Sequence, residues 1–529
     1  MSRYHDETEE IIITTGGSSR RDDGRSNELI VPVRTHHSRS HSGSRSPRPD
    51  RSPDRRPRPG YKRLIACCDG TWLNSDDGML NGELAVPSNV TRMSRAIKSQ
   101  SRDGIPQIVY YHRGVGSQGG IVDRVFMGAV GEGLGDAVRE AYSFISTNYT
   151  PGDEIFLIGF SRGAFTVRAV AGMIGTVGLL TKKGLPYWPE IFKDVTHAHD
   201  KHYRPKEPNL PFPNKPRMGP AYREELWRRG MTDLDAMVKA IGVFDTVGSL
   251  GLPRIDPLVK IGLQRDQSKE MRFYDTKLGP NIENAFQALA LDEKRAAFSP
   301  AVWERPPGCR TKLRQVWFPG VHSNVGGGYD DQEIADITLA WMMAQFSPFL
   351  DMYDDYIIQQ WEENQAYYRE RRKKPRPWSF GKIYNSSTGV YALGGSKTRT
   401  PGCYYATDPD TGQPTDRPLE DTNEYVHPSV RTRFVLRGPG EEDKGDYQPE
   451  ALDDWKLVVE YPDGERGAPE IYWKARFKDR NVSTRILPEC PLWRVERRLL
   501  GMDPEMEEEV MNPPPTSRRQ RRSTLGPPP

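Results

Sequence analysis

The sequence of 529 residues lacks the long apolar runs of a membrane protein. A membrane-spanning helix needs about 18 consecutive apolar residues, and the best candidate, 166–180, is interrupted by Arg168. The first residues, MSRYHDETEE, also lack the apolar core of a secretory signal peptide. We therefore expect neither a transmembrane segment nor a secretory signal.

Cysteine is scarce, and its five positions are scattered: Cys67, Cys68, Cys309, Cys403 and Cys490. An odd number in so long a chain predicts reduced thiols and a cytoplasmic protein. None of the cysteines has metal-ligand spacing, and the motifs H-E-x-x-H and G-x-x-x-x-G-K-[ST] are missing from the sequence. The sequence therefore predicts no metal ion and no P-loop nucleotide.

Positive charge is in excess only near the two ends of the sequence, although the net charge is +3. Residues 1–60 hold twelve Arg against nine Asp and Glu, and residues 513–529 hold four Arg and no acid. The part between them is therefore acidic, whereas a nucleic-acid-binding domain is normally basic. We expect no nucleic-acid partner, although the RRQRR cluster leaves a nuclear address as the alternative to the cytoplasm.

Composition divides the chain into four parts. Residues 1–60 are rich in Ser, Arg and Pro and predict a disordered tail, as do residues 505–529. Residues 61–349 carry the regular apolar pattern of a folded domain, with an aromatic and basic insertion at 183–232. Residues 350–504 are turn-rich with short strands, and we interpret them as a smaller accessory region.

Short apolar runs alternate with helical periodicity in the central part of the chain. The runs that predict strands are LIACCDG, QIVYYH, DEIFLIGF, AIGVFDTV and RQVWFPGV, and RTRFVL, WKLVVEY and EIYWKARF follow in the accessory region. Helical periodicity covers 89–98, 122–147, 163–180, 282–294 and 334–345. This alternation predicts an α/β fold with a doubly wound, mostly parallel sheet of the α/β-hydrolase type.

The sequence contains one G-x-S-x-G pattern, from Gly159 to Gly163, with Ser161 at its centre. By itself the pattern is weak, but here it directly follows the strand EIFLIGF and opens the helix GAFTVRAVAGMIG. A nucleophile elbow lies at such a strand-to-helix turn, and the flanking glycines relieve the clashes of its strained backbone. We predict that Ser161 is a catalytic nucleophile; a structural serine in a tight turn is the alternative.

A serine nucleophile needs a base and an acid, which in α/β-hydrolases follow in the order acid, then His. Asp245 and His322 each end a predicted strand, where α/β sites are assembled, so we predict them as the acid and the base. A turn-forming aspartate and a loop histidine are the structural alternatives. His427 is the rival base, although no strand-loop pattern supports it. His197, His199 and His202 lie in the insertion, where a surface position is expected.

Backbone N–H groups should stabilise the oxyanion that forms when the serine attacks. The N–H of Arg162 follows the nucleophile, and the loop after the first strand offers Gly70 or Thr71 as a second donor. Asp69 in the same loop could instead be a structural cap. The stretch GVGSQG at 114–119 matches G-x-G-x-x-G, but it opens no helix directly and lacks the following acidic residue, so we expect no cofactor.

Several linked blocks resemble a known family. LIACCDGTW, YYHRGVGS, GFSRGAFTVRAVAGMI, GVFDTVGSLG, ALALDEKRAAFSP and VWFPGVHSNVGGGY are similar, in this order, to the Tle-type catalytic domain of type VI secretion phospholipase effectors. The resemblance covers about 63–350, and the Ser-Pro-Arg tail is similar to that of fungal members. It implies Ser161, Asp245 and His322 as the triad and phospholipid esters as the substrate. The family often has His-Ser-Asp where this chain has His322-Ser323-Asn324. The chain thus lacks a carboxylate near the base, which puts an ion pair at that place in doubt.

Together these observations predict a serine hydrolase that acts on lipid or other carboxylic esters. The aromatic and basic insertion could contact a membrane surface peripherally or cover an acyl pocket. The alternatives are a non-catalytic scaffold with a hydrolase fold, or a thioesterase or amidase with another acyl substrate. The sequence does not give the oligomeric state.

Overall fold

The computed structural model describes residues 60–70, 79–80, 83–84, 86–114, 134–247, 277–386, 395–407, 414–462, 467–477, 482 and 484–515. By its internal contacts, the chain from Pro57 onward forms one compact unit. Residues 1–59 and 516–529 of the predicted tails lie outside the described residues, as do Thr71 and most of the GVGSQG stretch. The prediction of a disordered tail from residue 505 is wrong for its first part, because Pro504–Met511 form a helix that buries Met506 and Val510 in the core. The division of the folded part into a catalytic domain and an accessory region stays a prediction.

A seven-stranded sheet in the order β13-β10-β9-β8-β5-β1-β4 is the centre of the fold. All of its neighbouring strands are paired in parallel. The strands are β1 (Arg63–Cys68), β4 (Gln107–His112), β5 (Glu154–Phe160), β8 (Val238–Phe244), β9 (Asn284–Ala290), β10 (Lys312–Phe318) and β13 (Glu424–Val426). The chain passes from β1 to β4 on one side and then to β5 on the other, so the loops after β1 and β5 diverge at a topological switch point.

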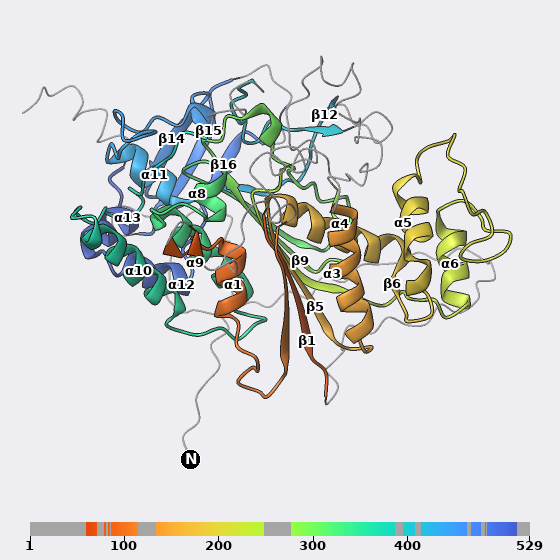
Figure 1. Ribbon diagram of the computed structural model, residues 1–529. Helices are drawn as coiled ribbons and strands as arrows, with labels where there is room; N and C mark the ends of the chain where they lie inside the picture. Colours follow the sequence, from red (N-terminus) through yellow and green to blue (C-terminus); the bar gives the residue numbers. More distant parts are fainter. Residues whose placement is uncertain are drawn as a thin grey trace, which may run out of the picture. The chain divides into compact units, whose positions relative to one another are not determined.

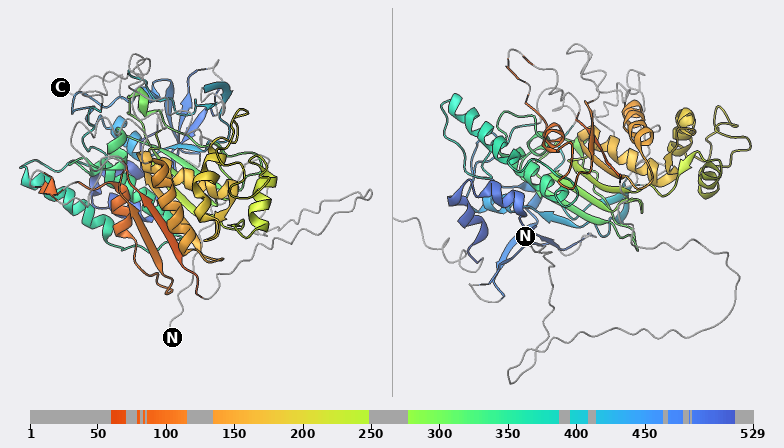
Figure 2. Two further views of the ribbon diagram at one scale, coloured as in Figure 1. Left: turned by 45° about the vertical axis from the view of Figure 1, so that its right-hand side comes forward. Right: turned by 90° about the horizontal axis from the view of Figure 1, so that it is seen from below.

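Helices cover both faces of this sheet, as Figures 1 and 2 show. One face carries α3 (Leu134–Asn148) and α4 (Ser161–Val177), and the other carries α1 (Asn89–Ala96) and α9 (Glu333–Phe346). Helix α9 is buried along its whole length, because α1, α10 (Tyr356–Glu370) and α12 (Arg494–Leu500) pack around it. The expected doubly wound α/β fold is therefore confirmed.

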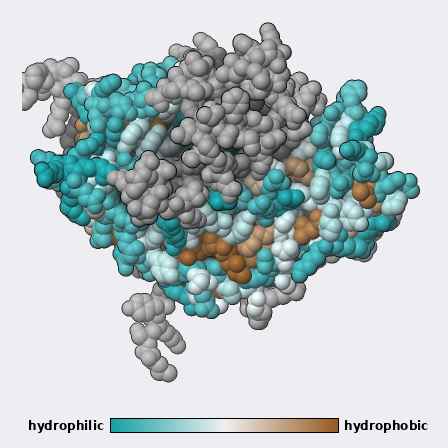
Figure 3. All heavy atoms as spheres, in the orientation of Figure 1, coloured by the Kyte–Doolittle hydropathy of each residue, from teal (hydrophilic) through white to brown (hydrophobic). Residues whose placement is uncertain are grey.

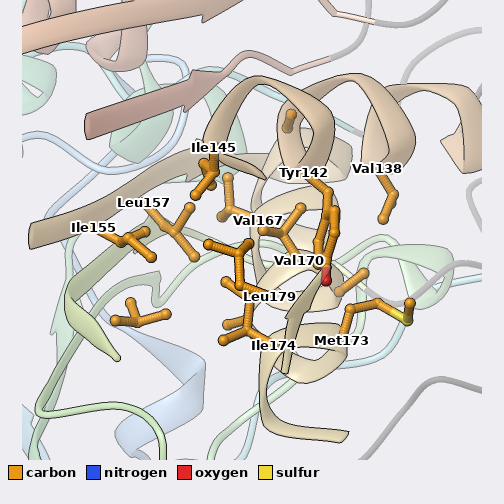
Figure 4. Close-up of a cluster of buried hydrophobic side chains, with 14 of the residues drawn as sticks. Val138, Tyr142, Ile145, Ile155, Leu157, Val167, Val170, Met173, Ile174 and Leu179 are labelled. Carbon is orange, nitrogen blue, oxygen red and sulfur yellow. The ribbon is translucent and has the colours of Figure 1, made fainter. Parts of the chain in front are cut away.

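Alternate residues of each strand enter different cores, because successive side chains of a strand point to opposite faces. In β5, Ile155 and Leu157 pack with α3 and α4, whereas Phe156 and Ile158 pack with α1 and α9. Figure 4 shows the first of these cores, where Tyr142 of α3 meets residues of α4. Both faces of the strand are buried, which explains why the sequence runs are continuously apolar.

Most predicted elements are confirmed, but two are wrong. The segment 282–294, predicted as a helix, contains the central strand β9, in which every residue is buried. Such a short buried run cannot be told from a helix by periodicity. RTRFVL, predicted as a strand, lies in helix α11 (Pro428–Val435), because Pro428 occupies its first turn and His427 caps it.

The insertion forms a folded layer beside α3 and α4. It contains η1 (Leu185–Tyr187), α5 (Trp188–Thr196) and α6 (Pro220–Arg228), and β6 (Leu179–Leu180) pairs with β7 (Thr232–Asp233) at its base. Trp188 and Phe212 are buried in the core that α3 and α4 share. The buried ion pair between Asp194 and Lys215, 2.6 Å long, ties α5 to the loop before α6.

The chain after α9 contributes to the central sheet and also forms smaller sheets. Its strand β13 pairs with β10, and β14 (Trp455–Glu460), β15 (Glu470–Ala475) and β16 (Ile486–Pro488) form an antiparallel sheet. The remaining elements are the pairs β2 (Met79–Leu80) with β3 (Glu83–Leu84) and β11 (Tyr405–Thr407) with β12 (Pro414–Pro418), the short helices α8 (His322–Gly326), η3 (Ala296–Phe298) and η5 (Glu450–Leu452), and α13 (Pro504–Met511).

The face drawn in Figure 3 is mostly hydrophilic, with apolar residues gathered near its lower centre. Among the described residues, the most exposed large apolar side chains are Trp227 of α6 and Tyr353, at 56% and 54%. None of the described helices is both long and apolar enough to cross a membrane. Contact of the insertion with a membrane surface stays a prediction.

Candidate active site

Ser161 occupies the sharp turn between β5 and α4 that the sequence predicts. Its φ of 56° lies in the left-handed region, which a non-glycine residue adopts at an energetic cost and often at a functional site. A Cβ on Gly163 would lie 2.1 Å from the carbonyl oxygen of Cys68, and a Cβ on Gly159 would lie 2.6 Å from that of Gly163. Gly163 therefore lets the elbow pack directly against the end of β1, and Gly159 lets the end of β5 approach the first turn of α4.

Asp245 and His322 meet in a direct hydrogen bond. Nδ1 of His322 lies 2.6 Å from Oδ2 of Asp245, and both side chains are buried. Asp245 directly follows β8, and His322 opens the short helix α8 after β10, so both lie at the carboxyl edge of the sheet. The arrangement orients the imidazole through Nδ1 and leaves Nε2 for another partner.

Two aromatic rings contact the imidazole. The ring of Phe160, the residue before Ser161, lies 4.7 Å from the His322 ring between centroids, and Phe298 approaches edge-on at 4.9 Å. In the part of the chain that the structure describes, Nε2 of His322 is buried without a hydrogen-bond partner. The contact with Phe160 places the imidazole beside the elbow that carries Ser161.

The ionisation of the pair follows from its surroundings. Burial alone would raise the pKa of Asp245, but the charge of Arg399 and the hydrogen bond from His322 hold that pKa below its usual range. Burial lowers the pKa of His322, and the hydrogen bond with Asp245 offsets only part of this effect. The aspartate is therefore ionised and the histidine neutral near pH 7, as a general base must be.

Arg399 forms a two-pronged ion pair with Asp245. Nη1 donates to Oδ1 at 2.5 Å, and Nη2 donates to Oδ2 at 2.9 Å. The same guanidinium donates to the carbonyl oxygens of Ala290 and Phe298 at 2.6 and 2.9 Å. Arg399 is not predicted from the sequence, because it stands in a turn-rich stretch without periodicity or motif.

A second ion pair supports the loop that carries His322. Glu293 accepts two hydrogen bonds from the Arg295 guanidinium, both at 2.9 Å, and one from the backbone N–H of His322 at 3.2 Å. Arg295 in turn lies over the ring of Phe298, 3.5 Å from its centroid. Both charged residues belong to the block ALALDEKRAAFSP, which is one of the blocks that resemble the family. No motif or periodicity in the sequence marks them otherwise.

Asp69 connects the loop after β1 to helix α1 and strand β4. Its carboxylate accepts hydrogen bonds from Ser88 Oγ at 2.7 Å, Thr91 Oγ1 at 2.9 Å and Tyr111 OH at 2.7 Å. Burial raises the pKa of Asp69, and these hydrogen bonds offset part of the increase. The side chain thus fixes the start of the loop for which an oxyanion donor is predicted.

The predicted oxyanion donors occupy different settings. Arg162 lies in the first turn of α4, where N–H groups find no acceptor within the helix. The N–H of Gly70 donates to Oδ1 of Asp69 at 2.7 Å, so an oxyanion could use it only after that bond opens. Thr71 lies outside the described residues. All three roles stay predictions.

His427, the rival base, lies in a different and fully buried cluster. Contrary to the sequence analysis, it does follow a strand of the central sheet, β13. Its Nδ1 lies 2.7 Å from Ser429 Oγ, and its Nε2 lies 2.9 Å from Glu496. The three side chains have the composition of a hydrolase triad, but they lie in the interior, at most 3% exposed, where His427 caps α11 and Glu496 caps α12.

The histidines of the insertion lie apart from this chemistry. His199 and His202 are exposed, and His197 stacks on Tyr203 with 4.4 Å between ring centroids. No group of three or more His, Cys, Asp and Glu residues in the described ranges has the geometry to hold a metal ion.

Asn324, at the position where the resemblance implies an aspartate, contacts the backbone rather than the imidazole. Its Oδ1 accepts the N–H of Val321 at 3.1 Å, and its Nδ2 donates to the carbonyl oxygen of Lys382 at 2.8 Å. An ionised aspartate could accept the first bond but could not donate the second. The substitution therefore joins α8 to the chain that follows α10.

Two known proteins are similar to parts of this chain. A relative, an uncharacterized protein of Saccharomyces cerevisiae, is 28% identical over 255 residues, which cover 45% of this chain and 32% of the yeast protein. The match thus spans about a third of the relative's length. A crystal structure of an uncharacterized protein from Pseudomonas aeruginosa shares 18% identity over 60% of this chain and 51% of that one, with a TM-score of 0.32.

The family model of the catalytic domain of Tle1-like phospholipase effectors of the type VI secretion system matches residues 62–345. This range contains the elbow at Ser161, the Asp245–His322 pair and the Glu293–Arg295 pair, whereas Arg399 lies beyond it. The matched range is more than half of the chain, and the chain belongs to the Tle1-like phospholipase effector catalytic domain family.

Proposed function

We propose that this protein hydrolyses carboxylic ester bonds of phospholipids with Ser161 as nucleophile, His322 as base and Asp245 as the acid that orients it. The hydrogen bond of 2.6 Å between His322 and Asp245, beside a strained serine elbow, is the observation that carries the proposal. The family supports the lipid class of the substrate, since its model describes phospholipase effectors.

The chemistry follows from the protonation states of the pair. Ser161 Oγ attacks the ester carbonyl carbon while Nε2 of His322 takes the hydroxyl proton, and the imidazolium that forms is stabilised by Asp245. The imidazolium then protonates the leaving alcohol, which departs and leaves an acyl group on Ser161. Water, activated by the same imidazole, cleaves this acyl-enzyme and releases a carboxylic acid.

Labelling with a fluorophosphonate tests for an activated serine. The wild-type protein should become labelled, and Ser161→Ala should not. Ser429→Ala is the matched control, because Ser429 also contacts a histidine but is fully buried, and its removal should leave labelling unchanged. A folded wild-type protein that resists labelling would favour the non-catalytic scaffold.

The substrate class needs a second assay. Release of fatty acid from phosphatidylcholine and phosphatidylglycerol vesicles should be measured beside hydrolysis of an acyl thioester and an acyl amide. We expect release from the phospholipids, and its loss in Ser161→Ala. If the protein hydrolysed only the thioester or only the amide, the proposed phospholipase activity would be refuted in favour of a thioesterase or an amidase.

A further inference from the structure

We infer that Arg399 is a positioning residue of the catalytic pair: it fixes both oxygens of Asp245 and compensates the charge that Asp245 presents to His322. The inference rests on the proposed function and adds to it a residue from outside the matched family domain. It stands on the contacts of one guanidinium group with three segments around the imidazole.

The carboxylate of Asp245 accepts four hydrogen bonds, two at each of its oxygens. Oδ1 accepts from Arg399 at 2.5 Å and from the backbone N–H of Ala290 at 3.0 Å. Oδ2 accepts from Arg399 at 2.9 Å and lies 2.6 Å from His322 Nδ1. A planar two-pronged pair of this kind sets the plane of a carboxylate, so the direction in which Oδ2 meets the imidazole is fixed.

Arg399 also positions the ring that lies against the imidazole. Its Nη2 donates to the carbonyl oxygen of Phe298, whose ring contacts His322 edge-on. Its Nη1 donates to the carbonyl oxygen of Ala290 at the end of β9. One side chain therefore joins the loop after β8, the end of β9 and the segment η3, all of which contact His322 or its partner.

The charge of Arg399 alters how strongly Asp245 can stabilise a protonated imidazole. Oδ2 is shared between the two cationic partners when His322 is protonated, and Arg399 is itself 4% exposed, so solvent screens it little. Among the described residues, the other charged groups that act on His322 are Glu293 and Arg295, which form their own ion pair. Removal of the positive charge at 399 should thus leave Asp245 freer to stabilise imidazolium.

The test compares Arg399→Gln, which removes the charge, with Arg399→Lys, which keeps the charge but loses the planar fork. Arg417→Gln is the matched control, because Arg417 forms a similar two-pronged pair with Glu304 at 2.6 and 2.8 Å. The first readout is the pKa of His322, followed by NMR in protein labelled at histidine Cε1 and assigned with His322→Gln. The second is the pH profile of kcat/KM for ester hydrolysis.

In Arg399→Gln we expect the pKa of His322 and the acid limb of the profile to rise, by on the order of one pH unit. In Arg399→Lys we expect an acid limb close to that of the wild type, with kcat about tenfold or more below it, because the carboxylate is no longer held in one plane. Arg417→Gln should change neither.

Unchanged pKa values in folded Arg399→Gln would overturn the inference, and so would failure of both variants to fold, since a merely structural role predicts it. The NMR readout does not require activity. A wild-type protein that neither hydrolyses esters nor reacts with a fluorophosphonate would refute the proposed function, whereas the response of His322 to Arg399→Gln would still decide the inference.

Discussion

Gly326 packs directly against the ring of Phe160, so closely that a Cβ on this glycine would lie 2.0 Å from the ring's Cε2. Gly326 ends the helix that His322 opens, and Phe160 directly precedes Ser161. The loops that carry the proposed base and nucleophile are therefore in contact. Gly326→Ala should cost about 1–3 kcal/mol of stability by overpacking and lower kcat by displacing His322.

Urea unfolding and the ester assay measure both effects of Gly326→Ala. Gly135→Ala in helix α3 is the control, because among the described residues its added Cβ would meet only Phe192 Cε1, at an ordinary 3.9 Å. It should stabilise the protein by up to about 1 kcal/mol, since alanine is the better helix former. Equal behaviour of the two variants would contradict the close approach of the two loops.

Asp69→Ala should destabilise the protein strongly. The change removes the acceptor of hydrogen bonds from Ser88 and Thr91, which are buried, and from Tyr111, which is part-buried, and each buried donor left without an acceptor costs about 1–3 kcal/mol. We expect a loss of at least about 3 kcal/mol on this basis, measured by urea unfolding. Tyr111→Phe removes a single donor and should cost about 1 kcal/mol. A mild effect of Asp69→Ala would show that water reaches these donors.

Activity should persist below the ordinary pKa of histidine. The base must be neutral to take the serine proton, and burial lowers the pKa of His322 from 6.5. As pH falls, the base is lost only when the pH passes this lowered pKa, so the acid limb of kcat/KM should have its midpoint below 6.5. The rate of fluorophosphonate labelling against pH measures it, with circular dichroism to show that the fold persists. A midpoint at or above 6.5 would contradict the buried environment.

Asp245→Asn should affect both catalysis and stability. The amide no longer stabilises the imidazolium, and kcat should fall by about 10⁴. The variant also leaves Arg399 buried with only neutral partners, which should cost about 3–5 kcal/mol. Enzyme kinetics and denaturant unfolding measure the two effects.

Asp421→Asn is the control for this change, because Asp421 forms an exposed two-pronged pair with Arg305 at 2.6 and 3.0 Å. An exposed pair of this kind should contribute less than about 1 kcal/mol. If Asp245→Asn and Asp421→Asn behaved alike, the buried pair would have neither the catalytic nor the structural role given to it here.

Local patterns were enough to predict the sheet's strands before residue 283 and the strand-to-helix turn at Ser161. They failed at β9, because a strand buried on both faces has no alternation that distinguishes it from a buried helix. They also failed at α11, where β-branched residues suggested a strand but a proline and a histidine cap start a helix.

The candidate site was predictable where a residue follows a strand, as Asp245 and His322 do. Arg399 was not, because its role depends on a tertiary contact across 154 positions of sequence. His427 shows the reverse case: it follows a strand of the sheet and contacts both a serine and a glutamate, yet both of its ring nitrogens are engaged and its serine, Ser429, is fully buried. Access to substrate is a property of packing, which spacing along a chain does not encode.

The late position of β13 in the chain has a consequence for biosynthesis. Gln315 and His427 supply backbone N–H groups to the pairing of β10 with β13, so the ribosome must pass residue 427 before this side of the sheet can close. Until then β10 presents an open edge, which is a template for aggregation in a nascent polypeptide. A chaperone that shields this edge during translation would therefore raise the yield of native protein more than one that acts after release.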